Sequence, residues 1–374
     1  MKILHIISDW KWTGPAEPVV NLCAELQRRG HDVTLAIAKV HGDNPPVLKE
    51  RALESGVKLY EGLTMRRRIN LVAIRDVRIL AAYIKKEKFD LVHTHLTHDH
   101  ALVSFALMGI KEAPLIVRTS HKGMPLKNSI GNRFLMRHAD ALITVSKIAG
   151  LKDADSFSLP LERMAVIQNA IDLERFVPRP KNESLMAELG IKSSDVVVGI
   201  VARLQRHRRY EVFLEAMKRI SKTHPYIKAI IVGRGTYAEQ VAYRPVREME
   251  LEGTVIMAGY RKDDYLDVLA LFDMKVFLVP GSDGSCRAAR ELMAMGKPII
   301  AARRGMLPEI IDDGVNGLII EDSAENLAKS IIKLAENEEA RKKMGSKARE
   351  MTLSSFSLEG QGERVEDFYS SFLA

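Results

Sequence analysis

Residues 280–298 read Pro-Gly-Ser-Asp-Gly-Ser-Cys-Arg-Ala-Ala-Arg-Glu-Leu-Met-Ala-Met-Gly-Lys-Pro, and they join a short apolar strand to an amphipathic helix. The strand is expected at residues 275–279 and the helix at residues 286–295. A glycine-bearing turn lets a ligand approach the backbone, and the free N–H groups of a helix N-terminus favour an anion. Asp283 lies in this turn. Glu291 lies in the helix, where its carboxylate suits two adjacent hydroxyls of a ribose or faces solvent.

Outward from this stretch, short apolar strands alternate with longer amphipathic segments, a pattern typical of α/β proteins with parallel sheets. Strands are expected at residues 2–8, 32–37, 91–93, 115–118, 141–145, 196–202, 227–232, 255–258, 275–279 and 298–301. One helix is expected after the first strand, with an apolar face formed by Val19, Leu22, Cys23 and Leu26. Further helices are expected at residues 210–221, 286–295, 323–351 and 357–373. Residues 168–182 hold two prolines among polar residues and are expected to be a linker. The sequence predicts two doubly wound parallel-sheet domains facing across a cleft, with ligands at the carboxyl ends of the strands.

Composition places the chain among globular proteins. It has 374 residues, of which 46% are hydrophobic and 28% charged, enough for two or three domains with ordinary cores. Its apolar runs are too short to span a bilayer, and the first strand begins at residue 2, so no signal peptide is expected. Two cysteines cannot build a disulfide framework, which favours a reducing, cytoplasmic location.

Net charge is +8 and unevenly distributed. Residues 51–150 carry 17 Lys and Arg against 8 Asp and Glu. Such a surface suits nucleic acid, an anionic membrane or a phosphorylated substrate, and charge alone does not choose among them.

Three further junctions carry polar groups at expected strand ends. Gly14 follows the first strand and precedes a helix, as in a phosphate-binding turn or a simple turn. A basic loop that contains Arg203 and Arg208 follows residues 196–202, and its guanidiniums suit a diphosphate. Residues 233–238 form G-x-G-x-x-A after a strand, but the acidic residue of a dinucleotide site is missing at the end of the next strand, which argues against NAD.

Residues 93–100 hold four histidines, in the order His-Thr-His-Leu-Thr-His-Asp-His. The spacing departs from the metallo-hydrolase pattern H-x-H-x-D-H, because three residues separate His95 from Asp99. A zinc site needs three or four convergent ligands. We therefore expect histidines that line a cleft at a strand end, and His121 is placed similarly after the strand at 115–118.

Together these junctions resemble the retaining, nucleotide-sugar-dependent glycosyltransferases of family 4, which have the GT-B fold. The resemblance covers nearly the whole chain and is most specific over residues 282–317, around the family's E-x(7)-E motif. Further matches lie at residues 139–146, 166–176 and 231–235. The resemblance implies two Rossmann-like domains, an acceptor-binding domain at 1–175 completed by a helix at 356–374, and a donor-binding domain at 176–355.

The resemblance also implies the site residues. Those expected to act in catalysis are Arg203 and Arg208, which clamp the diphosphate, His121 at the donor sugar, and Asp283. Those expected to bind the donor are Gly14, Gly233, Tyr260, Arg261, Gly284, Ser285, Cys286, Arg287 and Glu291. Two guanidiniums and a helix N-terminus can stabilise the leaving nucleoside diphosphate, so neither a metal nor another cofactor is expected.

Three positions depart from the family pattern, which is compatible with an altered donor or with a weakened one. The first acid of the motif is Asp283 rather than Glu. Pro15 stands where the family has a second glycine, and it has no N–H to donate. Arg209 stands where a glycine usually follows the second basic residue.

The implied activity is transfer of a sugar, with retention, from a nucleotide sugar to the hydroxyl of a glycan or lipid-linked acceptor, as in cell-envelope polysaccharide or lipopolysaccharide synthesis. UDP-hexose and UDP-N-acetylhexosamine are the expected donors. The alternatives are a nucleotide-sugar epimerase of the same fold and a basic, non-catalytic binding protein. Nucleic acid is not an expected partner, because the basic segment lacks interleaved aromatic residues. Residues 122–138 combine basic and apolar side chains, which predicts either docking on the inner face of the cytoplasmic membrane or packing on the first domain.

Overall fold

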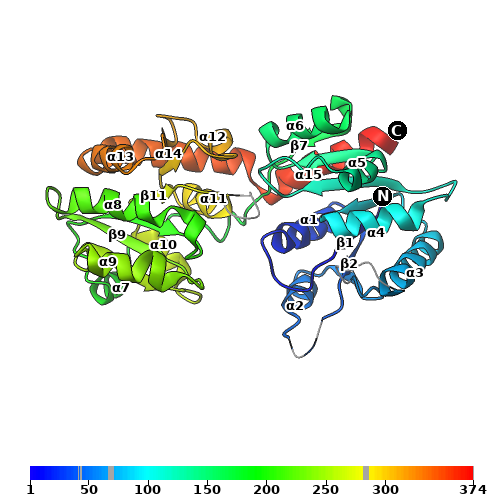
Figure 1. Ribbon diagram of the computed structural model, residues 1–374, viewed down its shortest axis with the longest axis horizontal. Coiled ribbons are helices and arrows are strands. Elements are labelled where there is room, and N and C mark those ends of the chain that lie inside the picture. Colours follow the sequence, from blue (N-terminus) through cyan, green and yellow to red (C-terminus); the bar gives the residue numbers. More distant parts are fainter. Residues whose placement is uncertain (41, 43, 66–70, 281–285, 374) are drawn as a thin grey trace. The chain divides into compact units, whose positions relative to one another are not determined.

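The computed structural model describes residues 1–40, 42, 44–65, 71–280 and 286–373. The chain divides into two compact units. Unit 1 contains Met1–Ala170 and the C-terminal segment from Leu358, and unit 2 contains Ile171–Gly281 and Cys286–Ser357. Each unit is a parallel sheet with helices on both sides, as in a Rossmann-like domain (Figure 1).

Unit 1 has a seven-stranded parallel sheet with the order β3-β2-β1-β4-β5-β6-β7. The strands are β1 (Lys2–Ile7), β2 (Asp32–Ile37), β3 (Lys58–Tyr60), β4 (Leu91–Thr94), β5 (Leu115–Ser120), β6 (Ala141–Thr144) and β7 (Met164–Val166). The helices are α1 (Ala16–Arg28), α2 (Val47–Glu54), α3 (Leu71–Glu87), α4 (Thr97–Leu107), α5 (Ile130–Arg137), α6 (Lys147–Phe157) and α15 (Leu358–Leu373).

Side chains alternate along the strands of unit 1 and so build two cores. Odd-numbered residues such as Ile3 and Val117 pack with α1, α2 and α15, and Cys23 lies in this core, as expected from the helical periodicity of its segment. Even-numbered residues such as Leu4 and Val92 pack with α3 and α4. The last helix of the chain, α15, packs beside α1 and therefore belongs to the first unit (Figure 1).

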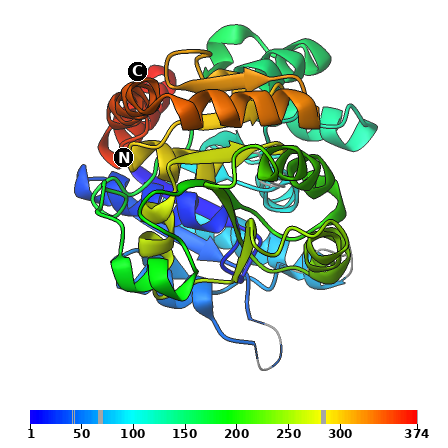
Figure 2. The same ribbon diagram turned by 90° about the vertical axis from the view of Figure 1, so that its left-hand side faces the viewer.

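Unit 2 has a six-stranded parallel sheet with the order β10-β9-β8-β11-β12-β13. The strands are β8 (Val196–Val201), β9 (Ile227–Val232), β10 (Val255–Gly259), β11 (Met274–Phe277), β12 (Ile299–Ala302) and β13 (Gly317–Ile320). The helices are α7 (Glu183–Glu188), α8 (Tyr210–Ser221), α9 (Arg244–Glu248), α10 (Tyr265–Leu271), α11 (Arg287–Ala294), α12 (Leu307–Ile310), α13 (Ala324–Glu336) and α14 (Glu338–Ser355). Helices α8 and α13 pack side by side on one face of this sheet (Figure 2).

The described residues contain no helix that is both long enough and apolar enough to cross a bilayer.

Tyr369 of α15 is fully buried in the core of unit 1, which makes the attachment of this helix testable. We expect Tyr369→Ala to lower the free energy of unfolding by on the order of 3–5 kcal/mol, because a large aromatic side chain leaves a cavity. Leu373→Ala in the same helix is the control, since Leu373 is 42% exposed. Urea denaturation of both variants measures the difference, and equal small losses would show that α15 is not part of the core.

Candidate active site

The strand order of each sheet reverses once, and ligands of doubly wound sheets bind at the carboxyl ends of the strands that flank such a reversal. The reversal lies between β1 and β4 in unit 1 and between β8 and β11 in unit 2. Gly14 follows β1 and His95 follows β4. Arg203 follows β8, and the stretch 280–298 follows β11. Each unit therefore has its expected polar junctions at one edge of its own sheet.

The basic loop after β8 is tied to the loop after β11. Arg203 is exposed and Arg208 is half-buried. Nη1 of Arg208 donates to the carbonyl oxygen of Val279 at 3.0 Å. This bond fixes the Arg208 guanidinium at the end of β11. Arg203 and Arg208 therefore both lie beside the reversal of strand order in unit 2, which we call its switch point.

Arg209 has a φ of 65°, in the left-handed region where glycine is the favoured residue. A glycine at this position, as in the family that the sequence resembles, satisfies the same backbone geometry. The side chain of Arg209 pairs with Asp322 at 3.0 Å and with Glu211 at 2.8 Å. The departure at Arg209 therefore leaves the backbone turn in place and adds two ion pairs.

The two glycines of the G-x-G-x-x-A stretch allow the loops after β8 and β9 to cross closely. A Cβ on Gly233 would lie 2.1 Å from the carbonyl oxygen of Ala202, and a Cβ on Gly235 would lie 2.3 Å from that of Leu204. The N–H of Leu204 donates to the carbonyl of Arg234 at 3.2 Å across this contact. These glycines hold the basic loop in position.

Glu291 is 3% exposed, so the alternative that it faces solvent is wrong. Its carboxylate accepts hydrogen bonds from the Tyr265 hydroxyl and from Nε of Arg287, both at 2.7 Å. Burial, and next the Glu291 carboxylate, raise the pKa of Tyr265 well above its usual value, so this hydroxyl remains a donor. A buried carboxylate held from two sides is preorganised to accept further hydrogen bonds.

Lys275 of β11 lies beneath α11 and is fully buried. Its Nζ donates to the carbonyl oxygen of Ala288 at 2.6 Å. Burial lowers the pKa of Lys275 to about 7, and the nearby Glu291 carboxylate opposes this shift. The lysine holds the first turn of the helix that carries Glu291.

The turn before α11 is only partly described. Asp283, Gly284 and Ser285 lie outside the described residues. Cys286 is the N-cap of α11 with a φ of 49°, and its carbonyl oxygen accepts a hydrogen bond from the N–H of Ala289 at 2.9 Å. Arg287 is the first residue of the helix.

Tyr260 and Arg261 follow β10 and have different environments. The Tyr260 ring is 57% exposed and lies 4.2 Å from the guanidinium carbon of Arg234. The two terminal nitrogens of Arg261 pair with Glu188 and Asp264, each at 2.7 Å. The Arg234 guanidinium thus lies over the exposed Tyr260 ring, whereas Arg261 fixes its own loop.

In unit 1, Asp9 organises the loop that carries Gly14. Its carboxylate accepts hydrogen bonds from the backbone N–H groups of Trp10 and Lys11, at 2.9 and 3.1 Å. The Thr13 hydroxyl donates to the same carboxylate at 3.3 Å. Gly14 is exposed at the end of this ordered turn.

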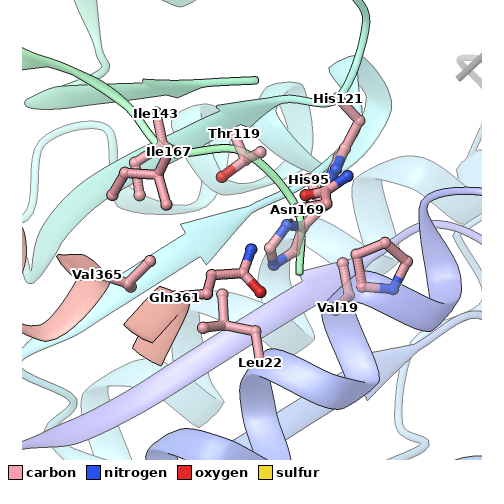
Figure 3. A pocket seen from close by; sticks show the side chains of 11 residues that line it. Val19, Leu22, His95, Thr119, His121, Ile143, Ile167, Asn169, Gln361 and Val365 are labelled. Atoms are coloured by element: carbon pink, nitrogen blue, oxygen red, sulfur yellow. Dashed lines mark hydrogen bonds between the residues drawn. The ribbon is translucent and has the colours of Figure 1, made fainter. Parts of the chain in front are cut away.

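His121 follows β5 and is 6% exposed. Burial lowers its pKa to about 4, so the ring is neutral at physiological pH. It lines a small cavity of about 10 Å³, together with His95, Thr119, Asn169 and Gln361 (Figure 3). A cavity of this size holds about one water molecule.

The expectation that the histidines of residues 93–100 line a cleft is wrong for two of them. His93 and His100 are 0% exposed and lie inside the unit. His93 pairs with the hydroxyls of Thr119 at 2.6 Å and Tyr369 at 2.5 Å. Successive side chains of a strand point to opposite faces of the sheet, so the His93 side chain points into the core that α1 and α15 cover.

Among the described residues, nitrogen atoms of His5, His93 and His95 lie within 4.8 Å of one another. Neutral imidazoles at such a spacing are potential ligands of a transition metal. In this structure they bond to each other and to hydroxyl groups instead.

Comparison with known proteins identifies the family. The profile described as Glycosyltransferase Family 4 matches residues 13–175, and the profile described as Glycosyl transferases group 1 matches residues 181–351. The chain belongs to glycosyltransferase family 4.

Two curated relatives and one solved structure illustrate the relationship. Spore coat protein SA of Bacillus subtilis is 24% identical over 95% of this chain and 94% of the relative. The UDP-Gal:alpha-D-GlcNAc-diphosphoundecaprenol alpha-1,3-galactosyltransferase of Escherichia coli is 24% identical over 85% and 84%. Anabaena HepE in complex with UDP has a TM-score of 0.81 at 19% identity, over 99% of this chain and all of that chain. The GT-B fold and the glycosyltransferase class are both confirmed.

Sequence reasoning about this glycosyltransferase missed Tyr265, Lys275 and His5. Tyr265 and Lys275 contact the residues of α11, and His5 contacts His95. None of the three belongs to a local motif. Only one signal could have indicated a role for His5: it is a polar residue at a position of β1 whose side chain points into an apolar core.

Gly233→Ala tests the loop crossing in the glycosyltransferase. The new Cβ would meet a backbone carbonyl at 2.1 Å at a φ of 150°, so we expect a loss of about 1–3 kcal/mol of stability. Gly253→Ala is the matched control, because no atom lies within 4 Å of its Cβ position. Thermal unfolding compares them, and an unchanged melting temperature for Gly233→Ala would contradict the close packing.

Proposed function

We propose that this glycosyltransferase moves a sugar, with retention, from a UDP-hexose or UDP-N-acetylhexosamine to the hydroxyl of a glycan or lipid-linked acceptor. The observation that carries the proposal is the set of groups at the switch point of unit 2. Two guanidiniums, the start of α11 and the buried Glu291 carboxylate all lie around the ends of β8 and β11.

The donor would bind with its diphosphate at Arg203 and Arg208 and its ribose hydroxyls at Glu291. Cleavage of the sugar–phosphate bond develops negative charge on the leaving phosphate, and preorganised cations stabilise that charge. The N–H groups at the start of α11 add to this stabilisation. Tyr260 would flank the base.

Unit 1 would supply the acceptor side of the reaction. His121 would approach the donor sugar and Gly14 the diphosphate. A neutral His121 suits this place, because it does not repel a sugar that gains positive charge as the leaving group departs. Attack by the acceptor hydroxyl on the face that the phosphate leaves would retain configuration.

The comparisons support the choice of donor and acceptor class. Structures of the neighbour HepE hold UDP or UDP-glucose. The name of the Escherichia coli relative specifies UDP-Gal and a diphosphoundecaprenol-linked acceptor. A lipid-linked acceptor would place the enzyme at the inner face of the cytoplasmic membrane, in synthesis of a cell-envelope polysaccharide.

We expect Arg203→Ala and Arg208→Ala each to lower the transfer rate by about 10²–10³-fold with the fold intact, because each removes one preorganised donor to the leaving phosphate. Arg219→Ala is the control, since Arg219 pairs with Glu215 on the surface of α8. A screen of UDP-, GDP- and ADP-sugars with detection of the released nucleotide measures turnover. Rates within twofold of wild type for both site variants would show that Arg203 and Arg208 do not clamp the diphosphate. Conversion of the donor that needs no second substrate and releases no nucleotide would favour an epimerase.

The segment before and within α5 offers a surface for membrane docking. Met124 and Ile130 are 67% and 89% exposed, whereas Leu135 and Met136 are buried against unit 1. The segment therefore packs on the domain by one side and leaves apolar side chains exposed on another. Lys122, Lys127, Arg133 and Arg137 are exposed in the same segment and can attract anionic headgroups.

We expect the protein to bind phosphatidylglycerol vesicles at low salt, because each basic residue near the surface contributes about 1 kcal/mol. Replacing both Met124 and Ile130 by Ser should weaken binding about tenfold or more, since two apolar side chains no longer insert. Leu161→Ser is the control, because Leu161 is an apolar residue with 60% exposure in a short 3-10 helix of unit 1, Leu161–Arg163. Cosedimentation measures binding. Equal binding to neutral vesicles, or none at low salt, would contradict docking.

A further inference from the structure

Three histidines from three neighbouring segments form a continuous hydrogen-bonded chain inside unit 1. His5 comes from β1, His95 follows β4 and His121 follows β5. Nδ1 of His5 lies 3.0 Å from Nε2 of His95, and Nδ1 of His95 lies 3.1 Å from Nε2 of His121. All three rings are at most 6% exposed.

The chain arises from strand register. β1, β4 and β5 are adjacent and parallel, and odd-numbered residues of all three point toward the core beneath α1 and α15. His5 pairs in register with His93, and His95 lies two residues further on. His93 does not join the chain, because both of its nitrogens bond to the hydroxyls of Thr119 and Tyr369.

Each ring of the chain carries one N–H. Burial lowers the pKa of His5 to about 3 and that of His121 to about 4, and it lowers the pKa of His95 well below the usual value. A neutral imidazole has one donor and one acceptor nitrogen. The N–H groups therefore all point the same way along the chain, either from His5 toward His121 or in the reverse direction.

The two directions differ at the ends. Within the described part of the chain, Nε2 of His5 and Nδ1 of His121 are both buried and have no hydrogen-bond partner. One of these two nitrogens must carry the last N–H, and an unmet buried donor is costly. Of the three histidines, His95 and His121 line the small cavity and His5 does not (Figure 3). The cavity has room for about one water molecule or one ligand oxygen, so only the His121 end of the chain can meet a partner there.

We propose that His5 and His95 are positioning residues for His121. His5 donates to His95, and His95 donates to His121, so that His121 presents its Nδ1–H to an oxygen of the ligand. The inference rests on the proposed function only in naming that ligand as the donor sugar. His121 is thereby assigned as a hydrogen-bond donor. Its tautomer is set through His95 by His5, which lies in β1.

The direct test reads the tautomer of His121 from the imidazole ¹⁵N chemical shifts of the full-length protein labelled with ¹⁵N-histidine. We expect protonated Nδ1 and bare Nε2 at His121 in the wild type. In His5→Phe, which keeps a ring but no donor, this single tautomer should be lost. In His5→Asn, whose amide nitrogen can still donate from the position of Nδ1, it should be retained.

Kinetics supply the second readout. His5→Phe should lower kcat by about 10–100-fold, the loss that follows when groups that orient metal-ligating histidines are removed, and His5→Asn should recover most of the loss. In a His121→Ala background, His5→Phe should have no further effect, because the positioned group is gone. Equal losses from His5→Phe in both backgrounds would assign His5 a purely structural role.

The wild-type spectrum decides the proposal even if a variant fails to fold. A proton on Nε2 of His121, or the same His121 tautomer in the wild type and in His5→Phe, overturns it. If no nucleotide sugar is turned over, the proposed function fails, whereas the ¹⁵N spectra still test the histidine chain.

Discussion

A parallel sheet covered by helices on both faces leaves mainly its ends for polar groups, and this constraint positions the candidate functional side chains of both units. Strand interiors such as those of β1 and β8 are almost wholly apolar because each face is buried. The polar junctions lie where β1, β4, β8 and β11 end, around the reversal of strand order. The same constraint explains why the basic loop after β8 and the turn after β11 become neighbours although about 75 residues separate them.

Polar side chains that do enter the interior are held by specific partners. Glu291 has Tyr265 and Arg287, Lys275 has a backbone carbonyl, and the histidines of unit 1 have one another. Buried polar groups cost free energy unless they are hydrogen-bonded, so each of these groups depends on its partner.

The departures from the family pattern have different structural consequences. Arg209 keeps the left-handed backbone of a glycine and gains ion pairs with Glu211 and Asp322. Pro15 is the N-cap of α1 with a φ of −73°, a conformation that proline adopts without strain. Neither residue disturbs its turn, although Pro15 removes one N–H from the loop that would face a diphosphate.

Much of the fold followed from local sequence. The apolar runs at 32–37 and 227–232 and the amphipathic run at 210–221 predict β2, β9 and α8 with the same bounds that the structure has, because burial on both faces or on one face imposes a readable period. The edge strands β3, β7 and β13 were not predicted. β3 and β7 have three residues each, which are too few to show a period. The junctions after β8 and β11 could be found because glycine and arginine cluster there. Tertiary structure alone decided that His5 meets His95, that Tyr265 holds Glu291 and that the glycines at 233 and 235 support the basic loop. Each of these contacts joins residues 26 or more positions apart, and strand order and register, which local sequence does not encode, bring them together.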